Sequence, residues 1–422
     1  MDSPAAPAPA SDLAARLRAG QRFAFGQTWL VYVAFYLVRQ NFSYAKPAMI
    51  ADGFSKQDLR TLSMAYLVMY ALGQFFTGML GDRFGARKVI LWSMGLAIAT
   101  NVVFGFGSGI GFLSLLMALN GIAQAGGFPQ CCKVLAAWFE PERRGRIVGL
   151  FLSSYTVGEL IALVLTGLIL RSANWQWAFF VPSALVAVAL AYIAWSLRAR
   201  PEDAGLPPLG GSAPPADADG GSKFGIEARR LLRMPALWVI MSSYFLLKLA
   251  RYTFKDWSNV YLKEEYHYDP SDSTFAVILI PIGGLMGTMV ATWLSDVVFQ
   301  TRRAPVVVLF TLALAGFSVA FAKLAADPVA AVLLLGVIGF FAYGADAVIS
   351  AASAMDLGDK EGASSAAGLI NGVGSLGTVL SAVVGADLST WLGWERAWMV
   401  LGGLLVISAL VLSTRWNVAG KR

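Results

Sequence analysis

Long apolar stretches alternate with short polar ones along almost the whole chain. A helix needs about 17–25 residues to cross a hydrocarbon core about 30 Å thick, and stretches of roughly that length occur twelve times. The expected spans cover residues 25–46, 61–81, 87–107, 110–138, 145–170, 175–197, 235–262, 272–298, 304–324, 328–352, 363–390 and 395–416. The pattern therefore predicts an all-α membrane protein with six helices on each side of a central break.

The central break has a different composition. It contains the run PEDAGLPPLGGSAPPADADGGSK, which is rich in Pro, Gly and acidic residues. Such a segment cannot bury a core, so we expect a mobile linker between two membrane halves. The predicted division is an N-terminal tail (1–24), a six-helix half (25–197), the linker (198–234), a second six-helix half (235–416) and a C-terminal tail (417–422).

Composition and charge agree with a membrane protein. The chain is 57% hydrophobic and 14% charged, against roughly 25% charged residues in soluble domains. Most Lys and Arg fall in the N-terminal tail, the even-numbered loops and the C-terminal tail, which predicts cytoplasmic termini. We expect the protein in the inner membrane of a bacterium. The basic residues form short clusters between apolar runs, so we expect a lipid bilayer and no nucleic acid as the partner.

Residues that serve enzymatic chemistry are scarce. Cys131 and Cys132 are adjacent in an apolar segment, and His267, the single histidine, lies in a polar loop. These positions provide no disulfide framework and no metal-ligand spacing, and the chain lacks phosphate-loop and nucleophile-elbow patterns. We therefore expect no enzymatic activity, no cofactor and no metal.

Charges inside two of the spans are the informative exception. Arg39 and Lys46 lie in the first span, and Lys248, Arg251 and Lys255 lie in the seventh. Each charge costs about 2.5–3.5 kcal/mol at a bilayer centre and is retained mainly where it pairs or faces a wet cavity. Corresponding helices of two pseudosymmetric halves face each other across such a cavity.

Several stretches resemble known transporters. GMLGDRFGARK after the second span resembles the signature loop of the major facilitator superfamily, and TWLSDVVFQTRR after the eighth is a weaker copy. FYLVRQNFSYAKPAM, GGFPQCCKVLAAWFEPERRGRIVG, RPEDAGLPP, PALWVIMSSYFLLKLARYTFKDWSNVYLKE and GFFAYGADAV resemble the organophosphate:phosphate antiporters, the group that contains the glycerol-3-phosphate and hexose-phosphate transporters. This resemblance runs from about residue 25 to 416 and implies the major facilitator fold.

The resemblance implies a substrate site between the halves. Arg39 and Arg251 are similar to the paired arginines that bind the phosphoryl group in this family. A guanidinium stays charged and offers a planar fork of donors to phosphate oxygens, which agrees with that role. The alternative is that each arginine only pairs with an intramembrane carboxylate.

Other residues near these arginines depart from the family pattern. Gln40 replaces a lysine, Tyr155 replaces a histidine, and Asp346 stands near the place of a proline. Lys255 is expected either to contact substrate or to extend toward the extracellular end. Glu159 and Asp346 are expected to act either as counter-ions of the arginines or as proton sites.

Further polar residues complete the expected site. Tyr36, Tyr252 and Asn371 join Gln40 and Tyr155 as candidate substrate contacts, with helix packing as the alternative. Lys46 and Lys248 are expected at the rim, and Asp256 against a neighbouring helix. A cytoplasmic gate network is expected from basic and acidic residues that otherwise only set topology, namely Asp82, Arg83, Arg87, Arg143 and Arg144.

The sequence thus favours a monomeric secondary transporter. We expect it to exchange a small phosphorylated organic anion for inorganic phosphate by alternating access. Two alternatives remain, a proton-coupled symporter of a phosphonate or carboxylate, and a non-transporting sensor of sugar phosphate.

Overall fold

The computed structural model describes residues 10–140, 143, 147, 150–208, 230–300, 302–349 and 363–418, and these residues form helices joined by short turns. The first half contains α1 (Ala10–Ala51), α2 (Lys56–Phe84), α3 (Ala86–Phe106), α4 (Ile110–Ala125), α5 (Gly127–Trp138), α7 (Ser153–Ile169) and α8 (Trp177–Ser196). The second contains α10 (Pro235–Tyr266), α11 (Pro270–Ala276), α12 (Leu279–Trp293), α13 (Arg303–Leu324), α14 (Pro328–Ala347), α16 (Ala363–Val383), α17 (Ser389–Leu392) and α18 (Trp394–Ser413). Short segments η1 (Pro201–Ala204), η2 (Leu294–Val298) and η4 (Val384–Leu388) complete the list.

Most of the expected membrane spans can be recognised in the structure from helix length and hydropathy alone. Eight helical segments in the described residues are long and apolar enough to cross a membrane, and α7 is apolar but only 17 residues long. The helices α1, α2 and α10 lie outside that set. Helices α1 and α10 carry charges inside their apolar stretches, whereas the charges of α2 lie near its two ends. All three form one long helix each, so the predicted twelve-span architecture holds although hydropathy alone selects fewer segments.

Several boundaries differ from those expected. Helix α1 begins at Ala10, within the expected tail, because its first turns consist of good helix formers and its Gln21 side chain donates to the Trp138 carbonyl. The fourth span is broken at Gly126, where a side chain would collide with Ser93 Oγ. The eighth span starts as the separate short helix α11, and both η2 and η4 are π-helical.

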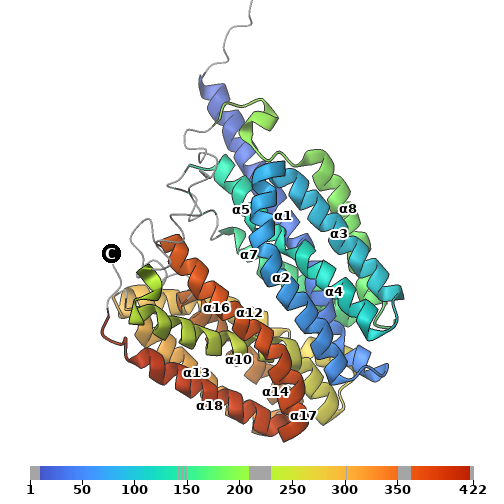
Figure 1. The fold of residues 1–422 in the computed structure, drawn as a ribbon, viewed down its shortest axis with the longest axis vertical. Helices are drawn as coiled ribbons and strands as arrows, with labels where there is room; N and C mark the ends of the chain where they lie inside the picture. The colour runs from blue at the N-terminus through green and yellow to red at the C-terminus, as the bar shows by residue number, and fades with distance from the viewer. Residues whose placement is uncertain are drawn as a thin grey trace, which may run out of the picture.

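The two halves separate at one end and meet at the other (Figure 1). One apolar core continues from the second half into the parts of α1, α2, α4 and α7 near the meeting end. A separate core fills the rest of the first half. We call the meeting end, where α1 joins α2, α10 joins α11 and α17 joins α18, the closed end.

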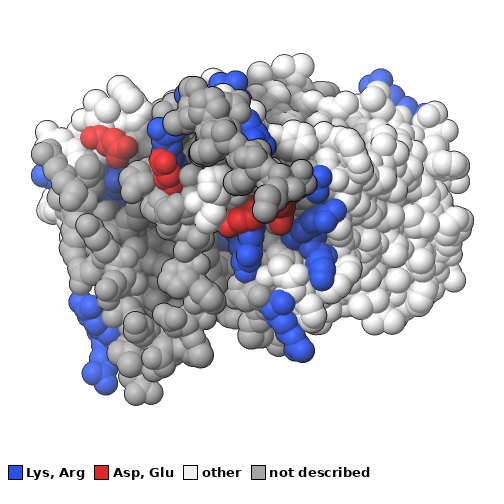
Figure 2. All heavy atoms as spheres, turned by 90° about the horizontal axis from the view of Figure 1, so that it is seen from above, with Lys and Arg blue, Asp and Glu red and all other residues white. Residues whose placement is uncertain are grey.

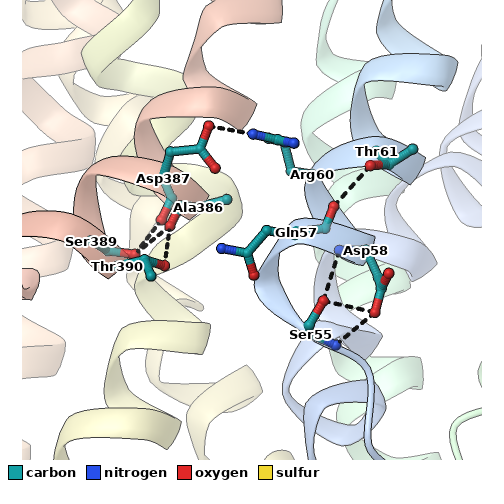
Figure 3. Close-up of polar contacts among 10 residues, drawn as sticks. Ser55, Gln57, Asp58, Arg60, Thr61, Ala386, Asp387, Ser389 and Thr390 are labelled. Atoms are coloured by element: carbon teal, nitrogen blue, oxygen red, sulfur yellow. Dashed lines mark hydrogen bonds and ion pairs between the residues drawn. The ribbon is translucent and has the colours of Figure 1, made fainter.

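Polar contacts reinforce the closed end. Lys56 pairs with Glu264 at 2.9 Å, and Arg60 of α2 points to Asp387 of η4 and pairs with it (Figure 3). The Asn259 amide donates to the Ser43 carbonyl at 2.9 Å. These bonds join opposite halves, so the closed end must break them in order to open.

Candidate anion-binding site

A small cavity lies between the two halves, on the side of the closed end that faces the middle of the molecule. Its free volume is about 40 Å³, enough for a few water molecules. Residues of α1, α2, α4 and α10 line it, namely Arg39, Gln40, Phe42, Ser43, Lys46, Ser63, Tyr66, Leu67, Met117, Tyr252, Lys255 and Asp256. Three cations and one carboxylate among these residues make the cavity wall electropositive.

Arg39 reaches the cavity from the middle of α1 and lies among aromatic rings. Its guanidinium carbon is 4.4 Å from the centroid of the Tyr70 ring, 5.3 Å from that of Tyr36 and 5.9 Å from that of Tyr66. One of its nitrogens donates to the Tyr70 hydroxyl at 3.3 Å. Among the residues that the structure describes, Arg39 has no carboxylate within ion-pair distance, so cation–π contacts replace a counter-ion.

Arg251 has a different environment on α10. Its guanidinium pairs with Asp346 of α14 at 2.8 Å and stacks on the Tyr343 ring at 3.7 Å. Arg251 Nε and Asp346 Oδ1 are buried without a hydrogen-bond partner in the described part of the chain. The ion pair therefore leaves one donor and one acceptor available to a ligand or to water.

Lys255, one turn beyond Arg251, connects the halves. Its ammonium lies 3.0 Å from Glu159 of α7, and the two side chains are 7% and 1% exposed. The Tyr44 hydroxyl donates to the same carboxylate oxygen at 3.2 Å. Removing one member of such a buried pair costs about 3–5 kcal/mol, so this contact helps to fix the state in which the closed end is shut.

Lys46 lies deeper than its expected rim position because α1 continues through Pro47 to Ala51. It is 1% exposed, and its ammonium donates to the Asp256 backbone carbonyl at 3.2 Å. The ammonium also lies over the Trp257 ring, 4.4 Å from the centroid. The structure thus places Lys46 in the same cavity as Arg39.

The remaining predicted contacts divide into two groups. Gln40 and Tyr252 line the cavity, and Tyr36 stacks beside Arg39, with the Tyr155 ring 6.0 Å from its own. Asn371 of α16 is exposed and accepts a hydrogen bond from the Tyr244 hydroxyl at 3.3 Å, so the structure does not bring it to the cavity.

The expected cytoplasmic gate is not assembled among the described side chains. Arg83 is exposed against Phe84, Arg87 donates to the Ala194 carbonyl, and Arg143 lies 3.9 Å from Glu140. These partners are local or belong to the same half. The side chain of Asp82 and all of Arg144 lie outside the described residues, and the gate stays a prediction.

Three tyrosines of the site were absent from the sequence-based prediction. Tyr66 and Tyr70 are four residues apart on α2, a spacing that places both on one helix face. Tyr343 precedes Asp346 by three residues on α14. The spacing was visible in the sequence, but the pairing of these faces with Arg39 and Arg251 depends on helix packing.

Comparison with known proteins agrees with this architecture. The sequence profile of the Major Facilitator Superfamily matches residues 28–382. The chain belongs to this superfamily. Solved superfamily structures have the same fold at low sequence identity. A bacterial homologue of the human lysosomal transporter Spinster, inward-facing and occupied, has a TM-score of 0.75 at 15% identity over 93% of this chain and 96% of its own. The nucleoside transporter NupG has a TM-score of 0.74 at 12% identity, over 93% and 100%.

Curated relatives narrow the family. The chain is 30% identical to a probable hexose phosphate transport protein of Chlamydia pneumoniae, over 94% of this chain and 91% of the relative. It is 30% identical to the membrane sensor protein UhpC of Salmonella typhimurium, over 97% and 94%. It is 28% identical to the glycerol-3-phosphate transporter of Bacillus subtilis, over 93% and 91%. These relatives confirm the resemblance to the organophosphate:phosphate antiporter family.

Proposed function

We propose that this superfamily member exchanges a small phosphorylated organic anion for inorganic phosphate by alternating access. The observation that carries the proposal is Arg39, a cation between the halves without a carboxylate partner among the described residues. Lys255, which lines the same cavity, comes from the other half, so an anion bound here contacts both halves. The names of the hexose-phosphate and glycerol-3-phosphate relatives support a phosphorylated ligand.

Exchange follows from the electrostatics of Arg39. When the cavity closes without an anion, Arg39 leaves water with tyrosine rings and the Tyr70 hydroxyl as its partners among the described residues, and desolvation of an unpaired ion costs several kcal/mol. A bound phosphoryl group offsets this cost through charge-assisted hydrogen bonds to the guanidinium fork. The loaded carrier therefore changes state more readily than the empty one, which couples entry of one anion to exit of another.

The membrane orientation belongs to the same proposal. Figure 2, viewed from the end where α1 projects, shows more blue than red side chains on this face and a broad uncharged flank. An excess of Lys and Arg marks the cytoplasmic side. We place this end and both termini in the cytoplasm. The molecule is placed in a bacterial inner membrane as a monomer. The boundary between the two halves is placed in residues 198–234. The structure then corresponds to an inward-facing state.

Transport in reconstituted liposomes tests this proposal. Purified protein is reconstituted with or without internal phosphate, and uptake of labelled glycerol 3-phosphate, glucose 6-phosphate and 3-phosphoglycerate is followed. We expect uptake of one of these compounds that depends on internal phosphate. Uptake of none of them, in vesicles where the protein is folded, would contradict the proposal.

A proton-coupled symporter of a phosphonate or carboxylate is the second candidate. The observation in its favour is Asp346, a largely buried carboxylate whose Oδ1 has no described partner and whose Oδ2 contacts Arg251. An anion that takes Arg251 from Asp346 leaves a carboxylate that then favours protonation. Uptake driven by an imposed proton gradient into phosphate-free vesicles would support this candidate over exchange.

A sensor without transport is the third candidate, favoured by the 30% identity to UhpC. In that case ligand binding shifts the carrier between states but no labelled compound accumulates. Binding of a phosphorylated sugar to purified protein, without uptake under either driving condition, distinguishes the sensor from both transporters.

A further inference from the structure

The part of the cavity nearest the closed end contains polar atoms that do not hydrogen-bond to Arg39 or Arg251. We call Lys46, Ser63 and Tyr66 the outer pocket. They are 1%, 7% and 7% exposed, and all line the cavity. Ser63 Oγ and the Tyr66 hydroxyl have no hydrogen-bond partner in the described part of the chain. Buried polar atoms are nearly always bonded, so the outer pocket is suited to polar atoms of a ligand.

The charge of Lys46 defines the kind of atom that fits. An ammonium has three donors and no acceptor, and the Asp256 carbonyl takes one donor. No described carboxylate lies within ion-pair distance of Lys46, although the Asp256 side chain also lines the cavity and partly offsets the charge. Since Ser63 and Tyr66 can donate as well, the outer pocket favours a group that only accepts, such as a carboxylate.

Two separate cationic points then face one cavity. Arg39 and Lys46 are seven residues apart on one face of α1, so their backbones are about 10 Å apart along the helix. The Arg39 guanidinium extends to Tyr70 of α2, while the Lys46 ammonium extends to Trp257 of α10. A ligand that meets both cations carries two anionic groups on a small carbon frame.

We propose that the outer pocket binds a carboxylate and that the substrate is a small phosphorylated carboxylic acid. Its phosphoryl group binds Arg39, and its carboxylate binds Lys46, Ser63 and Tyr66. This inference rests on the proposed function, because it adds a second anionic group to the same phosphorylated ligand.

Competition in the exchange assay tests the inference. Liposomes containing the full chain are loaded with labelled inorganic phosphate, and exit is measured against external 3-phosphoglycerate, glycerol 3-phosphate and glucose 6-phosphate. We expect half-maximal exit at a concentration of 3-phosphoglycerate about tenfold or more below that of glycerol 3-phosphate, because a hydrogen bond to a charged group distinguishes the two ligands. This comparison uses the unaltered protein and needs no variant.

Variants of Lys46 test whether this residue causes the preference for 3-phosphoglycerate over glycerol 3-phosphate. In Lys46→Gln the half-maximal concentration should rise about ten- to hundredfold more for 3-phosphoglycerate than for glycerol 3-phosphate, and Lys46→Arg should keep part of the preference. Lys248→Gln removes a cation outside the cavity wall and should leave the ratio of the two concentrations unchanged.

The possible outcomes distinguish a failure of the carboxylate pocket from a failure of the proposed exchange. Equal concentrations for the two compounds in the unaltered protein would overturn the carboxylate pocket while leaving exchange in place. An equal loss for both compounds in Lys46→Gln would assign Lys46 a purely structural role and also overturn it. Absence of phosphate exit with every compound would overturn the proposed exchange and this inference together.

Discussion

The two buried arginines of α1 and α10, one in each half, have different partners. Arg39 lies among Tyr36, Tyr66 and Tyr70 and has no described carboxylate partner, whereas Arg251 pairs with Asp346 at 2.8 Å. The N-terminal half thus supplies an uncompensated cation, and the C-terminal half supplies a cation with its own counter-ion. Pseudosymmetric positions therefore need not have equal electrostatic environments, and in the proposed exchange the N-terminal half attracts the ligand while the C-terminal half balances its own charge.

The largest expected effect concerns the stability of the Arg251 site. Arg251→Ala leaves Asp346 without its partner and should lower the free energy of unfolding by about 3–5 kcal/mol. In Arg251→Ala with Asp346→Ala, most of that loss should be recovered because no unpaired charge remains. Melting temperatures in detergent measure both effects, and a double variant as unstable as the single one would contradict the counter-ion role of Asp346.

Arg39→Ala should lower ligand affinity strongly and stability only weakly, in contrast to Arg251→Ala. Arg39→Ala removes an anion contact without leaving a carboxylate unpaired, so phosphate affinity should fall by about 2–5 kcal/mol, or roughly 30-fold and more. Its melting temperature should change less than that of Arg251→Ala, since the described contacts that are lost are cation–π contacts of about 0.5–2 kcal/mol and one hydrogen bond to the Tyr70 hydroxyl. Binding of labelled phosphate and thermal unfolding, measured on the same preparation, check this. Unchanged affinity would contradict the anion-binding role of Arg39.

In the proposed exchange, the ion pair with Asp346 competes with a phosphoryl group for Arg251. Asp346→Asn removes the competing charge, so phosphate should bind about tenfold more tightly, a difference of 1.4 kcal/mol. Asp346→Glu keeps the charge and is the matched control, with affinity close to that of the unaltered protein. Weaker binding by Asp346→Asn would show that the carboxylate orients Arg251 and does not compete with phosphate.

The smallest expected effect concerns the ion pair that helps to hold the closed end shut. Arg60→Gln breaks the pair with Asp387 at the closed end, where the two side chains are 32% and 14% exposed. Such partly exposed pairs contribute about 0.2–1 kcal/mol, so the open population should rise by less than about sixfold. With Cys131 and Cys132 replaced, labelling of Ser63→Cys by a membrane-impermeant thiol reagent added from the side of the closed end reports opening. Arg302→Gln, at the other end, is the control, and equal rates in the two variants would contradict a latching role for Arg60.

The sequence was sufficient to predict the architecture but not the partners. Apolar lengths predicted the spans, and the cost of buried charge singled out α1 and α10, which the structure places on either side of the cavity. The pairing of Lys255 with Glu159 and of Arg251 with Asp346 required the packing of α7 and α14, because a helix face does not specify which neighbour it meets. Lys46 was expected at a rim because the end of the first span was placed too early.

The closed end shows a different limit of sequence reasoning. Lys56, Arg60, Glu264 and Asp387 lie near loops, where a charge is ordinary and carries no signal of its own. Their pairing exists only in one arrangement of the two halves. Contacts that depend on a conformational state are therefore the part of the site that a single sequence specifies least.

In the proposed mechanism, Arg39, without a carboxylate partner in the described part of the chain, makes exchange the preferred mode of transport. The most direct measurement is exit of labelled phosphate from loaded liposomes, with and without external phosphate, for the unaltered protein and for Arg39→Gln. We expect external phosphate to accelerate exit strongly in the unaltered protein. In a folded Arg39→Gln variant we expect this acceleration to be lost. Equal acceleration in both proteins would contradict the proposed mechanism.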